Sequence, residues 1–196
     1  MKFTKEFLES RGLTPDKIAD TMLNFYRDID ATTARISEEL RQCGVQLKCY
    51  PGCCDCCVDE LSVNRSEEAV IRKLYPNIFE EPPHEPGKCP FLNENGLCRI
   101  YEARPFVCRT HGMPLKLVIS REEAAELGAV MDGEQDEVEL LDICEKNEEG
   151  IDIADLPDSA FLSHETCEVK LATMEMATFG EEEVRTDMRD LFVKKS

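Results

Sequence analysis

Cysteine is concentrated in two short windows of the chain. The first window, residues 49–57, contains five cysteines in nine residues, and the second contains Cys89, Cys98 and Cys108. Thiolates select zinc, copper(I) and iron–sulfur clusters over hard cations, and four cysteines suit either a tetrahedral zinc site or a cluster. This density of cysteines indicates metal binding. The alternative, in which each cysteine is only a small buried hydrophobic residue, would not explain why so many occur close together.

The spacing inside the first window favours convergence of several sulfur atoms. Two residues separate Cys53 from Cys56, and two separate Cys54 from Cys57. A short loop can place two such sulfurs at one point with little further loss of chain entropy. The Pro-Gly pair after Cys49 predicts a turn that lets Cys49 and Cys53 face the same point.

The second window has its own turn signal. The pair Asn95-Gly96 between apolar residues predicts a β-hairpin that places Cys89 and Cys98 on adjacent strands. Cys108 and His111 again have two residues between them. His111 is interpreted as a ligand or as a hydrogen-bond partner of a ligand, with a thiol–base catalytic pair as the alternative.

Composition argues against a disulfide framework. The chain has 196 residues, enough for one domain with an ordinary core, and an odd number of cysteines, eleven. Its first seven residues contain no apolar run of the kind found in signal peptides, and no stretch approaches the ~18 consecutive apolar residues of a membrane span. We therefore expect a cytoplasmic protein with reduced thiols and no membrane partner.

The charge is strongly acidic but unevenly distributed. A formal net charge of −18 argues against a nucleic-acid partner, since phosphates would be repelled. Residues 88–116, which hold the second cysteine window, are net +3. Arg104 and Arg109 in this segment are candidate cofactor-binding residues, because they can offset the negative charge of a metal–thiolate site and donate hydrogen bonds to sulfur.

The elements that must position these residues are mainly helical. Thr14 can cap a helix over 14–43, where apolar residues recur at three, four or seven and Gly44 ends the pattern. Cys43 and Cys167, at a helix end and inside a helix, are interpreted as small buried hydrophobes. Strands are predicted at 58–63, 115–119 and 138–143, and further helices over 66–75, 121–131, 163–179 and 181–193.

Together these elements predict an α+β fold, mainly helical, with short β-hairpins around a cysteine-rich metal centre. Residues 1–44 are expected to form an N-terminal helical segment and 45–145 the cysteine-cluster domain. Residues 146–196 are expected to form an acidic, helical C-terminal segment packed on the same domain.

The pattern also resembles a known family. The runs Cys49-x3-Cys53-x2-Cys56-Cys57, Cys89-Pro90-Phe91-Leu92 and Cys98-x-Ile100-Tyr101-x2-Arg104-Pro105-x2-Cys108-Arg109 resemble the YkgJ-type cysteine-cluster family over residues 45–145. Members are described as zinc- or iron-chelating domains or as iron–sulfur-cluster proteins, and some relatives are labelled flagellin N-methylases. The resemblance implies eight ligands, enough for two four-sulfur sites or one multinuclear site: Cys49, Cys53, Cys56, Cys57, Cys89, Cys98, Cys108 and Cys144.

One cysteine departs from this pattern. Relatives usually carry a small residue such as glycine where this chain has Cys54. The identity of the ligating cysteine within each adjacent pair therefore stays open at this level.

Three functions fit these features. The favoured one is a non-catalytic protein that holds zinc or iron in a structural or chelating role. Zinc is preferred over an iron–sulfur cluster in protein handled in air, because clusters often decay. One alternative is a metal-dependent enzyme acting on a protein side chain, or a redox protein. The other is a metal-shaped interaction module whose acidic C-terminal third binds a basic protein.

Overall fold

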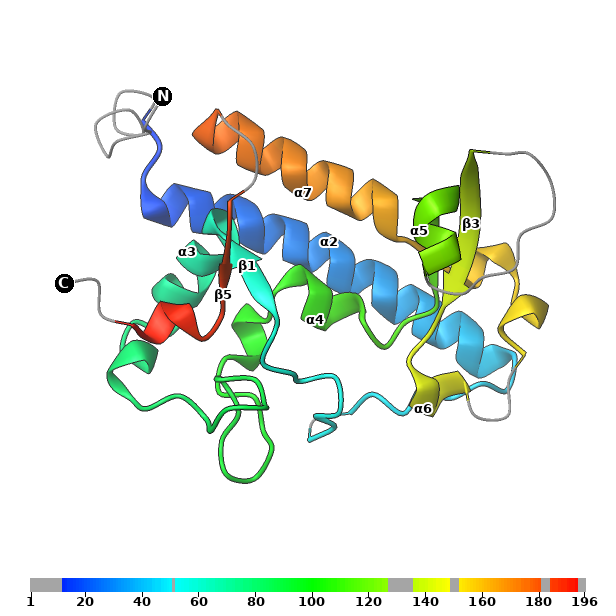
Figure 1. Ribbon diagram of the computed structural model, residues 1–196, viewed down its shortest axis with the longest axis horizontal. Helices are drawn as coiled ribbons and strands as arrows, with labels where there is room; N and C mark the ends of the chain where they lie inside the picture. The colour runs from blue at the N-terminus through cyan, green and yellow to red at the C-terminus, as the bar shows by residue number, and fades with distance from the viewer. Residues whose placement is uncertain (1–11, 51, 127–135, 149–151, 181–183, 194–196) are drawn as a thin grey trace. The chain divides into compact units, whose positions relative to one another are not determined.

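The computed structural model describes residues 12–50, 52–126, 136–148, 152–180 and 184–193 and has the predicted α+β architecture. No helix in these ranges combines the length and the hydropathy needed to span a membrane. Figure 1 shows the elements. The helices are α2 (Pro15–Gln42), α3 (Arg65–Leu74), α4 (Phe106–Thr110), α5 (Arg121–Glu126), α6 (Glu145–Glu148) and α7 (His164–Phe179). The strands are β1 (Ser62–Asn64), β2 (Leu115–Ser120), β3 (Glu137–Asp142), β4 (Leu162–Ser163) and β5 (Arg185–Asp187).

Five 3₁₀ turns complete the described elements: η1 (Ile78–Glu80), η2 (Tyr101–Ala103), η3 (Ile153–Asp155), η4 (Asp158–Ala160) and η5 (Asp190–Phe192). The chain divides into two compact units that are interleaved along the sequence. The first unit comprises Met1–Ile29, Tyr50–Arg109 and Leu171–Ser196, and the second comprises Asp30–Cys49 and Thr110–Lys170.

Helix α2 confirms the predicted helix over 14–43. Thr14 Oγ1 accepts a hydrogen bond from the Lys17 amide at 3.3 Å, which caps the first turn. Gly44 ends the helix with a φ of +83°, and the Val45 amide reaches back to the Leu40 carbonyl at 2.8 Å. The predicted apolar stripe is buried along its whole length: Ile18, Met22, Phe25, Ile29, Ile36 and Leu40.

In the first unit, α3 begins one residue earlier than the sequence predicted. Asn64 is its N-cap, and Asn64 and Glu67 form a reciprocal capping box. The predicted strand over 58–63 is wrong for residues 58–61, which form a loop, and pairing begins only at Ser62. Because β1 is so short, its contribution to the fold depends on the partner strand.

That partner is β5, and it corrects the helix predicted over 181–193. Residues 185–187 pair antiparallel with β1, with Thr186 opposite Val63, and a 3₁₀ turn follows (Figure 1). The acidic run suggested a helix start, but pairing with a strand more than a hundred residues away overrides local propensity. The start of the predicted helix, residues 181–183, lies outside the described residues.

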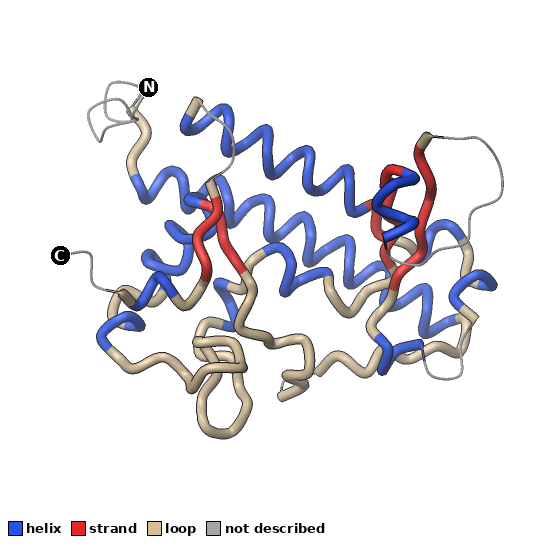
Figure 2. The backbone as a smooth tube through the Cα atoms, in the orientation of Figure 1, coloured by secondary structure: helices blue, strands red, loops and turns tan. Residues whose placement is uncertain are grey.

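The second unit contains a three-stranded sheet in the order β3-β2-β4, visible as red tube in Figure 2. β2 and β3 pair antiparallel from Leu115↔Asp142 to Ser120↔Glu137, which confirms the strands predicted at 115–119 and 138–143. The parallel pairing of β2 with β4 was not predicted. The helix predicted over 121–131 is confirmed through Glu126 as α5, and its remainder lies outside the described residues.

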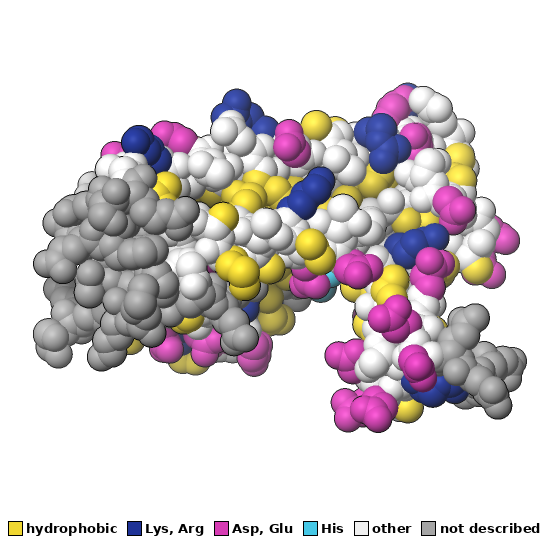
Figure 3. Space-filling view, turned by 90° about the horizontal axis from the view of Figure 1, so that it is seen from above, with side chains coloured by type: hydrophobic (Ala, Val, Ile, Leu, Met, Phe, Trp, Pro, Cys, Tyr) yellow, Lys and Arg dark blue, Asp and Glu magenta, His cyan; other side chains and the backbone are white. Residues whose placement is uncertain are grey.

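The described surface reflects the acidic composition. Figure 3 shows one face, on which Asp and Glu side chains are spread among Lys and Arg side chains.

Candidate metal centre

Four of the five cysteines in the first window belong to a loop of the first unit. Two turns shape this loop: the Cys53 amide donates to the Tyr50 carbonyl at 2.9 Å, and the Cys57 amide donates to the Cys54 carbonyl at 3.1 Å. The side chains of Cys56 and Cys57 are hydrogen-bonded to each other, and this contact, followed by burial, raises the pKa of the Cys56 thiol. The loop therefore presents a Cys56 thiol that stays protonated at neutral pH.

The predicted turn between Cys89 and Cys98 is present, although the strands around it are not. Asn93 Oδ1 accepts from the amides of Asn95 and Leu97, both at 2.9 Å, and this closes the turn. Pairing is limited to an isolated bridge between Leu92 and Cys98, so the hairpin predicted here is reduced to a turn. Asn side-chain hydrogen bonds replace the ladder that longer strands would supply.

This turn also contacts the first window. Gly96 has a φ of +73°, which its missing side chain permits, and a Cβ added to it would lie 3.3 Å from Cys54 Sγ. The Cys89 amide donates to the Cys57 carbonyl at 3.0 Å. Two backbone segments that are distant in sequence are thus joined beside their cysteines.

Cys108 lies on α4, near three other thiols. Burial is the main reason that its pKa is raised, and negative charge on Cys89, Cys98 or Cys56 would raise it further. Burial likewise raises the pKa of Cys89 to about 11. Cys108 is therefore close enough to Cys56, Cys89 and Cys98 to be affected by a charge on any of them, and each of these four thiols of the first unit has a raised pKa.

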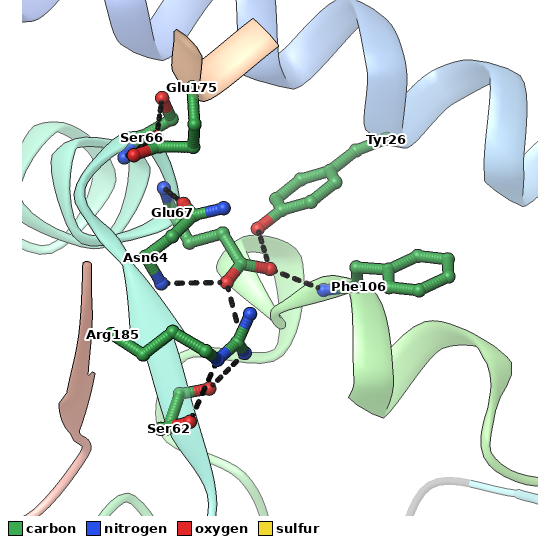
Figure 4. Close-up of polar contacts among 8 residues, drawn as sticks. All are labelled: Tyr26, Ser62, Asn64, Ser66, Glu67, Phe106, Glu175 and Arg185. Atoms are coloured by element: carbon green, nitrogen blue, oxygen red, sulfur yellow. Dashed lines mark hydrogen bonds and ion pairs between the residues drawn. The ribbon is translucent and has the colours of Figure 1, made fainter. Parts of the chain in front are cut away.

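A buried carboxylate fixes the helix that carries Cys108. Glu67, only 1% exposed, accepts from the Phe106 amide at 2.8 Å and from the Asn64 amide at 3.0 Å (Figure 4). The Tyr26 hydroxyl lies 3.5 Å from the same carboxylate, and burial, with the Glu67 charge second, raises the pKa of Tyr26 well above its usual value. Glu67 therefore joins the start of α3 to the first residue of α4. The sequence signal for it was the capping-box pattern.

A second carboxylate of the same region is also buried and also bound. Glu175, from α7, accepts from the amide of Ser66 at 2.9 Å and from the Ser66 hydroxyl (Figure 4). It forms an ion pair with Arg65 at 3.5 Å. Two buried acids thus meet the first turn of α3. Oε1 of Glu175 accepts the hydrogen bonds from Ser66, whereas its Oε2 has the ion pair with Arg65 and no hydrogen-bond donor among the described residues.

The two arginines predicted to bind a cofactor have different surroundings. Arg109 donates to the carbonyls of Arg104 and Glu102 at 2.8 and 2.6 Å, and its guanidinium lies 4.1 Å from the centre of the Tyr26 ring. The Arg104 guanidinium stacks on Tyr101 at 3.7 Å. Arg109 thus orders the local backbone, while Arg104 is oriented mainly by an aromatic ring.

Arg104 has a guanidinium N–H group with no acceptor in the described part of the chain, near the candidate ligand Cys98. Its Nε is buried without a hydrogen-bond partner among the described residues, as is that of Arg99. Burial raises the pKa of Cys98, whereas the charges of Arg104 and then Arg99 act in the opposite direction. Unsatisfied guanidinium N–H groups near a thiol fit a site that contains thiolate sulfur, because charged donors stabilise a negatively charged acceptor.

The second unit holds Cys49 and Cys144. Cys49 is exposed, and its Sγ accepts from Asn147 Nδ2 at 3.4 Å. The same amide donates to the Gly112 carbonyl at 2.7 Å, and Asn147 is 2% exposed. The backbone amide of Asn147 donates to the Cys144 carbonyl at 2.7 Å. Asn147 therefore links the two cysteines, and sequence analysis missed it because an isolated Asn carries no motif.

The other cysteines and the histidine considered in the sequence analysis differ in their exposure to solvent. Cys167 is 6% exposed, which confirms its interpretation as a buried hydrophobe, whereas Cys43 is exposed and the same interpretation is wrong for it. Cys43 follows the end of α2, where the chain turns away at Gly44. His111 is exposed. All eleven cysteines are free thiols in the structure.

These observations test whether the residues suit a metal. Among the described side chains, no three His, Cys, Asp or Glu residues are already arranged around one point. The donor chemistry nevertheless fits, because soft thiols gather in the first unit beside guanidinium donors that lack partners. The loop carrying Cys53, Cys56 and Cys57 has no helix or strand to resist a small closing movement.

Comparison with known families confirms the resemblance noted in the sequence. The profile of the family CxxCxxCC, described as "Putative zinc- or iron-chelating domain", matches residues 48–145, half of the chain. This range contains every cysteine predicted as a ligand. Comparison with curated proteins and with solved structures gave no match. The chain therefore belongs to the CxxCxxCC family of zinc- or iron-chelating domains.

Proposed function

We propose that this protein holds zinc or iron through clustered thiolates, in a structural or metal-chelating role and not a catalytic one. The observation that carries the proposal is the grouping of Cys56, Cys89 and Cys98 around Cys108, four buried or half-buried thiols of the first unit. Four is the number of sulfur ligands in a closed zinc site and in a common iron–sulfur cluster.

The other proposed ligands are assigned by unit. Cys53 and Cys57 supply further donors in the first unit, and Cys49 and Cys144 are the donors of the second. Residues 45–145 form the proposed metal-binding domain, with flanking segments at 1–44 and 146–196. Arg104 is the proposed donor to thiolate sulfur, and Arg109 supports the backbone beside Cys108.

Because the pKa values of these thiols are raised, metal binding must be coupled to the release of protons. Thiols with a pKa as high as the value of about 11 for Cys89 are protonated at neutral pH, so ligation requires them to release protons. The bound ion would supply the positive charge that makes several adjacent thiolates tolerable in a buried place. Protons leave from the sulfur atoms as the ion enters, and binding therefore becomes tighter as pH rises.

Metal analysis of anaerobically purified protein, together with an absorption spectrum, tests the proposal. Stoichiometric zinc without a visible band would identify a zinc site, and iron with a broad visible band would identify a cluster. Cys43→Ser is the matched control, because it removes an exposed thiol outside the proposed ligand set. Reduced, folded protein that contains neither metal and takes up neither on addition would contradict the proposal.

A further inference from the structure

Arg189 makes an unusual set of contacts for a residue far from the cysteine windows. Its guanidinium donates four hydrogen bonds: to Asp59 Oδ1 at 2.5 Å, and to the carbonyls of His84, Glu85 and Lys88 at 2.9, 3.2 and 2.9 Å. The side chain is 26% exposed. All of these residues belong to the first unit, but Arg189 lies outside the range that matches the family.

The acceptors belong to two segments that carry candidate ligands. Asp59 follows Cys57 by two residues, and Lys88 immediately precedes Cys89. The carboxylate of Asp59 also accepts from the Gly87 amide at 3.0 Å, and the Cys89 amide donates to the Cys57 carbonyl at 3.0 Å. The guanidinium therefore bridges the loop that ends at Cys57 and the segment that leads into Cys89.

These segments need such a bridge because they have little structure of their own. Residues 81–90 contain neither helix nor strand, and Pro82, Pro83 and Pro86 have no amide hydrogen to donate. The carbonyl groups of this segment must therefore find donors elsewhere in the chain. One planar guanidinium satisfies three such carbonyls and the Asp59 carboxylate together, which a lysine ammonium with three donors cannot do.

Arg189 is itself held in place by its neighbours along the chain. The Met188 amide donates to the Leu61 carbonyl at 2.9 Å, continuing the β1–β5 pairing. The ring of Phe192, three residues after Arg189, has its centre 5.2 Å from the ring centres of both Phe79 and Phe91. Phe91 lies in the turn between Cys89 and Cys98, so the C-terminal segment contacts this turn by apolar packing and the preceding segment by the hydrogen bonds of Arg189.

We propose that Arg189 is a positioning residue that holds the loop of Cys56 and Cys57 and the Cys89 segment at the separation needed for thiolates of both segments to bind metal together. The proposal rests on the proposed function above. It assigns to the C-terminal segment, outside the family range, a direct part in metal binding.

Two simpler roles for Arg189 make different predictions. If only its positive charge near the thiols matters, lysine should restore metal binding. If it stabilises the fold in general, its loss should expose every buried thiol, including Cys167 in the second unit. A positioning role predicts that lysine fails and that only Cys57 and Cys89 change.

The experiment compares wild type, Arg189→Ala, Arg189→Lys and the control Arg41→Ala, which removes an exposed arginine that pairs with Glu38. Zinc affinity is measured by chelator competition, and the alkylation rate of each cysteine in the metal-free, reduced chain is measured by mass spectrometry. Both Arg189 variants are expected to bind zinc at least about tenfold more weakly, as for loss of other groups that orient ligands. Cys57 and Cys89 should be alkylated faster, while Cys167 and the control variant stay at wild-type values.

Each other outcome decides against the proposal. Wild-type zinc affinity in Arg189→Lys would show that charge alone matters, and wild-type affinity in Arg189→Ala would show that the residue is dispensable. Wild-type chain that binds neither zinc nor iron would overturn the proposed function and this inference together, whereas the two preceding outcomes overturn this inference alone.

A second variant covers the case in which alanine loosens the whole chain, which faster alkylation of Cys167 would reveal. Asp59→Ala removes the anchor on the Cys57 side and leaves the three carbonyl contacts of Arg189 in place. It is expected to weaken zinc binding and to speed alkylation of Cys57 without affecting Cys167. Unchanged zinc affinity in a folded Asp59→Ala variant would overturn the inference.

Discussion

The two units of this protein hold their cysteines in contrasting ways. In the first unit, the thiols of Cys56, Cys89, Cys98 and Cys108 have raised pKa values, and Cys108 lies near enough to the other three to be affected by their charge. In the second unit, Cys49 is exposed and accepts a hydrogen bond from the amide side chain of Asn147. The first arrangement provides enough sulfur for a complete four-ligand site, and the second provides two thiols that share one hydrogen-bonding residue.

The contrast extends to the supporting groups. The first unit supports its thiols with charged side chains. Glu67 of α3 binds the first amide of α4, Arg189 joins two loops, and Arg104 lies near Cys98. The second unit uses the neutral side chain of Asn147 and the bare α-carbon of Gly112. We infer that the first unit is organised for tight ligation, because charged donors and acceptors bind buried partners more strongly than neutral ones.

Removal of metal should have the largest effect, and should act mainly on the first unit. Zinc–thiolate binding can contribute on the order of 10 kcal/mol to folding at neutral pH. Stripping the metal with a strong chelator should therefore lower the melting temperature and alter the near-ultraviolet circular dichroism, and it should speed alkylation of Cys89 and Cys108 more than that of Cys167. An unchanged melting curve after complete metal removal would contradict this dependence.

Loss of the Glu67 carboxylate should come next. Glu67→Ala leaves the amides of Phe106 and Asn64 buried without their acceptor, which should cost about 3 kcal/mol of unfolding free energy in urea denaturation. Glu67→Gln keeps one carbonyl oxygen and should cost less, about 1–2 kcal/mol. Glu39→Ala, at a surface pair with Arg35, is the control and should change stability by less than about 0.5 kcal/mol. Equal stability of all three variants would show that Glu67 does not support α4.

The metal-free protein should lose stability at alkaline pH because of its first-unit thiols. Burial raises the pKa of Cys89 from 9.0 in the unfolded chain to about 11 in the folded chain. Between these values the unfolded chain has released the proton and the folded chain has kept it, so stability present below pH 9 is lost as pH rises through 11. Two pKa units correspond to about 2.7 kcal/mol.

Urea denaturation from pH 8 to pH 11 measures this loss. Cys89→Ser should remove the contribution of Cys89 to the decrease of unfolding free energy with pH, because a serine hydroxyl does not titrate in this range. A slope that Cys89→Ser leaves unchanged would mean that Cys89 is not the group responsible.

The smallest effect is expected at Gly112 in the second unit. A Cβ added to Gly112 would overlap Cys49 Sγ, so Gly112→Ala must displace that thiol. Cys49 is exposed and can move, and we expect a cost of about 1 kcal/mol, at the low end for overpacking. Faster alkylation of Cys49, with no change at Cys89, would confirm that the second unit is adjusted locally. An equal increase in the alkylation rate of Cys89 would contradict independent behaviour of the two units.

The sequence was most informative where the signal is local. The apolar stripe of α2, the strands β2 and β3 and the Asn-Gly turn between Cys89 and Cys98 all depend on residues within a few positions of one another. The cysteine spacing predicted the family and the donor chemistry for the same reason. The exposed position of Cys43 was not predictable, because the end of a helix can turn either way.

The supporting groups were missed because they act over long separations. Arg189 and Asp59 are 130 residues apart, and the amide of Phe106 lies 39 residues from Glu67. Asn147 contacts Cys49 across 98 residues. None of these pairs has a periodicity or a motif, and the pairing of β5 with β1 replaced a helix that the acidic run had suggested.

The most direct test of the central claim is the metal content of two matched double variants. Cys89→Ser/Cys108→Ser removes two thiols from the first unit, and Cys49→Ser/Cys144→Ser removes two from the second. If the first unit holds a complete site, the first double variant should purify without zinc or iron and the second should retain at least one ion per chain. Full metal content in the first double variant, or its complete loss in the second, would contradict the claim.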